Sequence, residues 1–94
     1  MAVTLEQAKA WCNVEHDEDD KLINSLIVQV QKAAEDFCRR DFSEEMPETV
    51  ASAILIMVGY LYDHRDNDDR NAYKATHEAF RSLLWPNRDE EAML

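Results

Sequence analysis

The most apolar stretch of the chain lies near its centre, at residues 51–62, where the sequence reads ASAILIMVGYLY. At about 100° per residue, its apolar side chains fall on two adjoining stripes of a helix, which together form one very wide face. The stripes are Val50, Ile54, Met57 and Leu61, and Ala51, Leu55, Val58 and Tyr62. A membrane span needs about 20 such residues, so the segment is predicted to be a buried helix of a soluble domain.

Three further segments have apolar residues at the spacing of amphipathic helices, and we expect them to cover the central helix. The four helices are expected at residues 5–13, 18–39, 47–64 and 72–84. No segment alternates apolar and polar residues as strands do, and the sequence has a single glycine for turns. The prediction is an all-α fold: one small four-helix domain over residues 1–94, built around one buried central helix and ending in an acidic tail at 87–94.

Residues at the ends of these segments indicate where helices start and stop. Thr4 and Gln7 have the spacing of a capping box for the first helix. Asp17 is expected to cap the second helix, whose acidic first turn suits the positive end of the helix dipole. Arg39 and Arg40 close that helix, where cations suit the negative end. These end signals agree with the apolar spacing.

Two apolar residues of the central helix, Ile56 and Tyr60, fall outside its wide face. A chain of 94 residues buries only a little over about 60% of the surface that its unfolded form exposes, so its core is small. We therefore expect Ile56 and Tyr60 to contact another subunit; the alternative is that the first helix covers them. Trp85, just before a proline, is either folded back on the domain or offered to a partner.

Composition and charge narrow the function. The chain carries 20 acidic and 10 basic side chains, which give a formal net charge of −10 at pH 7. Such a protein is expected to be repelled by the phosphate backbone of nucleic acids. The charge therefore argues against nucleic-acid binding as the main function.

The two cysteines, Cys12 and Cys38, each close an apolar stripe. Neither has a neighbouring histidine in the sequence that could act as a base, so both are expected to be buried structural thiols. The chain begins without the pattern of a signal segment, so we expect the thiols to be reduced, in a cytoplasmic setting.

The sequence offers no catalytic or metal-binding motif. The acidic runs at residues 15–20 and 63–71 lack the glycine of an EF-hand loop, and the second contains arginines that would compete with an ion. HEAFR at residues 77–81 lacks the second histidine of a zinc-protease helix, so His77 is expected at the edge of the core. No nucleophile lies at a recognisable spacing from a base, and no glycine-rich phosphate loop is present. We predict a protein without enzymatic activity, metal or cofactor.

Three segments resemble a known family in their order and spacing. Residues 4–27 read TLEQAKAWCNVEHDEDDKLINSLI, residues 47–65 read PETVASAILIMVGYLYDHR, and residues 83–88 read LLWPNR. Together they resemble the small helical head-tail connector proteins of long-tailed bacteriophages, often labelled as DNA packaging proteins. The family commonly has a glycine near the end of the second helix, where this chain has Arg39 and Arg40.

The resemblance implies a structural role in the neck of the virion, after assembly in the cytoplasm of the host bacterium. Identical subunits would form a ring between the portal and the tail-side proteins, and DNA would pass through it without specific binding and without involvement of a membrane. Arg65, Trp85 and Arg88 become candidates, with Ile56 and Tyr60, for contacts with a neighbouring subunit, the portal or the tail.

A channel for DNA is expected to have an acidic or neutral wall, because many Lys or Arg contacts would hold the phosphates. The candidates for that wall are Asp66, Asp68 and Asp69, or else the tail at 89–91. The alternative is that these carboxylates face outward and serve solubility only. The alternative function for the whole chain is that of an acidic soluble regulator, or DNA mimic, that binds a basic partner protein.

Overall fold

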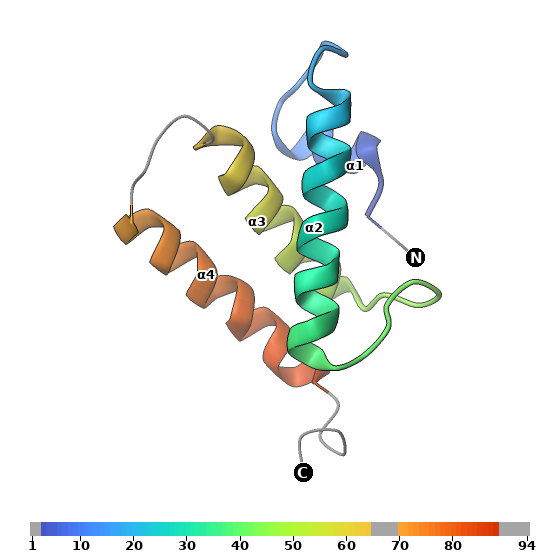
Figure 1. The fold of residues 1–94 in the computed structure, drawn as a ribbon, viewed down its shortest axis with the longest axis vertical. Coiled ribbons are helices and arrows are strands. Elements are labelled where there is room, and N and C mark those ends of the chain that lie inside the picture. Colours follow the sequence, from blue (N-terminus) through green and yellow to red (C-terminus); the bar gives the residue numbers. More distant parts are fainter. Residues whose placement is uncertain (1–2, 65–69, 89–94) are drawn as a thin grey trace.

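The computed structural model describes residues 3–64 and 70–88 and contains four α-helices in chain order (Figure 1). They are α1 (Leu5–Trp11), α2 (Asp20–Cys38), α3 (Glu48–Asp63) and α4 (Arg70–Leu84), and a 3₁₀ turn, η1 (Trp85–Asn87), follows. No strand occurs in these two ranges, and the helices pack into one globule. The predicted all-α, four-helix fold is confirmed.

The helix ends lie within two residues of the predicted ones, and two differences have physical causes. The capping box of Thr4 and Gln7 is formed, with both reciprocal hydrogen bonds. The first helix nevertheless ends at Trp11, because Asn13 has a left-handed backbone conformation with φ 59°, which α-helical geometry does not allow.

The prediction that Asp17 caps the second helix is wrong. Asp17 lies before the cap position, which Asp19 occupies without a capping side-chain hydrogen bond. The Asp17 carboxylate accepts a hydrogen bond from Lys9 Nζ at 2.7 Å, and Lys9 also contacts Asp20 at 2.9 Å. The Asp19 carboxylate accepts a hydrogen bond of 2.6 Å from the Tyr62 hydroxyl on α3. The acidic segment thus connects the start of α2 to α1 through Lys9 and to α3 through Tyr62. Asp17 does not cap α2.

The helix α3 is the centre of the fold, with α4, α2 and α1 packed against it (Figure 1). Its buried residues are Val50, Ala53, Ile54, Met57, Val58, Gly59 and Tyr62. Five of these belong to the predicted stripes, while Ala51, Leu55 and Leu61 are half-buried against the core. Ala53 and Gly59 were not expected in the buried face; their small size lets neighbouring elements approach the helix closely.

Gly59 marks the closest of these approaches. A Cβ atom at this position would lie 2.8 Å from Nε1 and 2.9 Å from Cδ1 of Trp11. The indole of Trp11 therefore rests on the backbone of α3, although 52% of the residue is exposed. The contact anchors the short helix α1, and only glycine leaves room for it.

Gly59→Ala tests this contact. In a Trp11→Ala background we expect the substitution to stabilise the protein by about 1 kcal/mol, because alanine is the better helix former. In the wild-type background the methyl group meets the indole, so this gain is cancelled or reversed. Urea unfolding followed by circular dichroism measures the difference, and equal effects in the two backgrounds would contradict the contact.

The link between α2 and α3 is fixed by one aromatic side chain. Phe42 is fully buried, and its backbone N–H donates to the Glu35 carboxylate of α2 at 2.9 Å. Met46 is buried near the end of the same link. The link is therefore held to the core at two points before α3 begins.

Candidate interaction surface

The C-terminal ends of α2 and α4 meet in a group of aromatic and arginine side chains. Phe37 of α2 lies 6.5 Å from Trp85 of η1, measured between ring centroids. The guanidinium carbons of Arg81 and Arg88 lie 5.4 Å and 5.2 Å from the centre of the Phe37 ring. Arg88 also lies over Trp85 at 4.2 Å. Both guanidinium groups therefore lie over aromatic rings, in cation–π geometry. The rings belong to α2 and η1.

Arg39 and Arg40, at the end of α2, belong to the same end of the molecule. Arg40 donates from Nη1 to the backbone oxygen of Asn87 at 3.0 Å, and its guanidinium lies 5.4 Å from the Phe42 ring centre. Asn87 in turn donates from its amide to Thr49 Oγ1 at 2.8 Å. These bonds hold η1 against the beginning of α3. The segment that carries Arg88 is therefore held to the end of α2 and to α3 by hydrogen bonds.

Arg39 has an unusual backbone for its residue type. It closes α2 in the left-handed conformation, with φ 54° and ψ 40°. A non-glycine residue in this region costs about 1–2 kcal/mol, and glycine is the usual residue here. Glycine would therefore adopt this backbone more easily than the arginine that closes α2.

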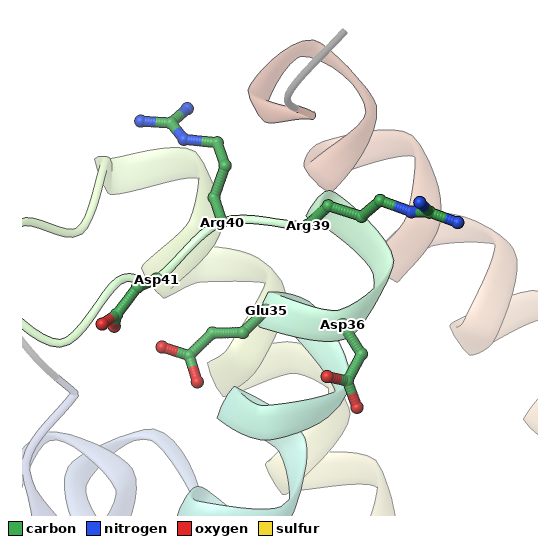
Figure 2. Close-up of a pocket in the computed structure, with 5 residues that line it drawn as sticks. All are labelled: Glu35, Asp36, Arg39, Arg40 and Asp41. Atoms are coloured by element: carbon green, nitrogen blue, oxygen red, sulfur yellow. The ribbon is translucent and has the colours of Figure 1, made fainter. Parts of the chain in front are cut away.

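Figure 2 shows how the arginines lie relative to the nearby acidic residues. Arg39 and Arg40 point away from the carboxylates of Glu35, Asp36 and Asp41, with which they line a shallow hollow. The Glu35 carboxylate is engaged with the backbone of Phe42. In the part of the chain that the structure describes, Arg40 and Arg81 form no ion pair.

We call Arg39, Arg40, Arg81 and Arg88, with Phe37 and Trp85 between them, the arginine patch. It gathers four of the chain's 10 basic side chains at one end of a protein of net charge −10. Arg81 and Arg88 lie over aromatic rings, and the planar guanidinium group matches the two oxygens of a carboxylate. The chemistry of the patch suits the binding of acidic groups.

The structure unites some of the predicted contact residues but not others. Trp85 and Arg88 lie together in the arginine patch, and Trp85 is both packed against Phe37 and 59% exposed. Ile56 and Tyr60 are half-buried and belong to α3, not to the patch. Arg65, Asp66, Asp68 and Asp69, and the tail at 89–91, lie outside the described residues.

Tyr60 contacts aromatic rings at the end of its own helix and on α4. Its ring stacks on His64 at 4.2 Å and lies 6.0 Å from Tyr73 of α4. His77 continues this row on α4, stacked on Tyr73 at 5.7 Å, and is half-buried at the edge of the core as expected. The last helix therefore covers part of the surface that the sequence leaves for a partner.

The patch residues Phe37 and Arg81 were not among the sequence candidates. In the sequence, Phe37 is one apolar residue among others of the second helix, and Arg81 ends the HEAFR segment. A possible signal was the spacing of Arg81, Trp85 and Arg88, which places two cations around one indole at the end of a helix. The partner ring of Phe37 is far away in the sequence, so the full patch appears only in the fold.

Both cysteines are free, and Cys38 is fully buried where α2 and α4 end. Its thiol contacts the backbone oxygen of Leu84 at 3.6 Å. Burial raises the pKa of Cys38 and of the half-buried Cys12, and the carboxylate of Asp63 raises the pKa of Cys12 further. A raised pKa keeps both groups in the unreactive thiol form.

We expect both thiols to react with an aromatic disulfide reagent much more slowly in the folded protein than in urea at pH 8. The folded state holds the thiol protons more tightly than the unfolded chain, and this difference adds to the free energy of unfolding. The contribution is fully present at pH values below the ordinary thiol pKa. It is lost as the pH rises through the raised values. A double Cys12→Ala, Cys38→Ala variant should lose a few kcal/mol at most. Equal reaction rates in the folded and unfolded protein would show that the thiols are accessible.

No group of three or more histidine, cysteine, aspartate or glutamate side chains in the described ranges is placed to hold a metal ion. None of the helices seen in those ranges is long and apolar enough to span a membrane. The fold and its surface define a small helical domain that carries the arginine patch at the ends of α2 and α4.

The comparison with protein families identifies this domain further. The family model of the phage gp6-like head-tail connector protein matches residues 2–84, almost the whole chain. The chain therefore belongs to this family of structural phage proteins, as its sequence resemblance indicated. Comparison with curated proteins and with solved structures gave no match.

Proposed function

We propose that the protein is a connector subunit that assembles with copies of itself into a ring in the neck of the virion. The observation that carries this proposal is the family match over residues 2–84. The ring would lie between the portal and the tail-side proteins and extend the channel for DNA. Assembly would take place in the cytoplasm of the host bacterium.

The exposed surface of the subunit is consistent with this role. Trp11, Val28, Tyr73 and Trp85 are large apolar residues with 46–68% of their surface exposed. Scattered single residues of this kind are ordinary, but aromatic side chains and arginines are the types enriched in protein interfaces. A cyclic assembly of identical subunits would cover such residues repeatedly.

DNA would pass through the ring without specific binding. The acidic residues Asp66, Asp68 and Asp69 remain our candidates for the channel wall, because carboxylates do not hold phosphates. Arg65, beside them in the sequence, and Ile56 remain candidates for contact with a neighbouring subunit, the portal or the tail.

The oligomeric state tests the proposal. Light scattering after size exclusion, and native mass spectrometry, should show ring-sized particles of the purified protein at high concentration or on addition of the portal. A protein that stays monomeric under all these conditions would contradict the ring. If that monomer bound a basic protein tightly instead, it would fit an acidic regulator.

A further inference from the structure

The arginine patch and the most acidic described segment lie at opposite ends of the subunit. The helix α2 runs along the longest dimension of the molecule, which is 43 Å (Figure 1). The segment at residues 15–20, with the sequence EHDEDD, precedes the start of α2, and the patch surrounds its end. Each subunit therefore carries four arginines around the end of α2, beside the carboxylates of Glu35, Asp36 and Asp41, and a run of acidic residues before its start.

The acidic run is exposed and held in place. Glu15 and Glu18 are exposed, and the side chain of Asp17 is 88% exposed even though it contacts Lys9. Lys9 also contacts Asp20, so one lysine fixes the segment from the side of α1. The outer carboxylates are thus presented on a supported segment.

We propose that the arginine patch of one subunit binds the acidic segment at residues 15–20 of a second copy of this chain. The proposal rests on the ring proposed above and names the contact that would build it. Charge complementarity favours this occupant: guanidinium groups pair with carboxylates in a bidentate geometry, and Glu15, Asp17 and Glu18 of the segment are exposed, while Asp19 and Asp20 are engaged within the subunit. The aromatic rings between the arginines add apolar area at the same place.

The overall charge of the chain strengthens this argument. Two subunits of net charge −10 repel each other at a distance, so their association needs a local attraction that is stronger than the general repulsion. Gathering four arginines at one end supplies that attraction and also fixes the orientation of the approaching subunit. The opposite positions of the two surfaces make the contact heterologous, and such contacts form rings when the rotation between subunits closes.

Arg39 provides an independent reason to assign a function to the patch. Its left-handed backbone would be easier for glycine, and the side chain found there carries a charge at this end. Backbone strain of this kind is concentrated at functional sites. In the proposed contact, the side chain of Arg39 is one of the groups that bind the neighbour.

The first test separates the side chain of Arg39 from its backbone. Arg39→Gly should raise the urea midpoint of the monomer, because the left-handed position is relieved, and yet weaken assembly about tenfold or more. A purely structural role would move both measurements in the same direction. A variant that is more stable and assembles as well as the wild type would overturn the proposal.

The second test exchanges the charges of the two surfaces. Arg81→Glu and Glu18→Lys should each weaken assembly, while Lys74→Glu, which makes the same charge change as Arg81→Glu on the exposed first half of α4, should not. The double variant Arg81→Glu, Glu18→Lys, and an equal mixture of the two single variants, should both recover assembly. Circular dichroism and urea unfolding of each variant exclude misfolding as the cause.

The outcomes distinguish this contact from the ring itself. If the wild type assembles and the charge exchange restores nothing, the contact is wrong and the ring stands. If variants of the patch assemble normally but lose retention of double-stranded DNA, the patch serves DNA and the proposed partner is wrong. A wild type that never assembles, alone or with the portal, overturns both proposals.

Discussion

Phe42→Ala is expected to lower the free energy of unfolding by about 3–5 kcal/mol. The side chain is fully buried and is the largest of the fully buried residues, so its removal leaves a cavity as well as losing apolar contact. It also removes the aromatic anchor of the link between α2 and α3, although the backbone N–H at this position can still donate to Glu35. Such a loss is a large part of the stability of a domain of this size.

Urea unfolding followed by circular dichroism measures this effect. Val28→Ala on α2 is the matched control, because Val28 is 68% exposed, and its change should stay within about 0.5 kcal/mol. A loss below about 1 kcal/mol for Phe42→Ala would mean that the link does not depend on its aromatic anchor.

Ile56→Asp is expected to abolish ring assembly while the monomer stays folded. Ile56 is half-buried on the central helix and is not among the residues packed against the core, so a carboxylate there remains in contact with water in the monomer. At a subunit contact the same carboxylate would lose water without gaining a partner, and burying an unpaired charge costs several kcal/mol. Light scattering follows assembly, and circular dichroism follows folding.

Two control variants define the possible outcomes for Ile56. Ile54→Asp introduces the same group at a fully buried position of α3 and should unfold the monomer. Ala79→Asp introduces it at an exposed position of α4 and should leave both folding and assembly intact. If Ile56→Asp behaves like Ile54→Asp, the residue belongs to the core; if it behaves like Ala79→Asp, the subunit contact lies elsewhere.

The sequence predicts the helices well because their signals are local. The apolar spacing and the capping box of Thr4 and Gln7 act within a few residues, and all four helices appear where these signals place them. Asp17 could not be predicted from local signals. Its carboxylate could cap the helix start or pair with Lys9, and the fold brings Lys9 within hydrogen-bonding distance. Gly59 enters the buried face for the same reason, because Trp11 of α1 packs on it.

The interaction surface is less predictable because its parts are far apart in the sequence. Trp85 and Arg88 could be singled out by their position after the last helix and by resemblance to a family. Phe37 and Arg81 join them only when the ends of α2 and α4 meet. Tyr60 shows the opposite case, since it has no apparent partner in the sequence and finds Tyr73 across the α3–α4 interface.

The order in which the helices pack has a consequence for how the subunit forms. Most contacts join helices that are neighbours in the sequence, α1 with α2, α2 with α3 and α3 with α4. Such local topologies close short loops and fold in about microseconds to milliseconds, which stopped-flow or temperature-jump refolding would resolve. Newly made chains would then reach the native state long before they meet one another at ordinary concentrations. The rate of ring formation would be set by encounter between finished subunits, and hence by protein concentration and ionic strength, not by folding.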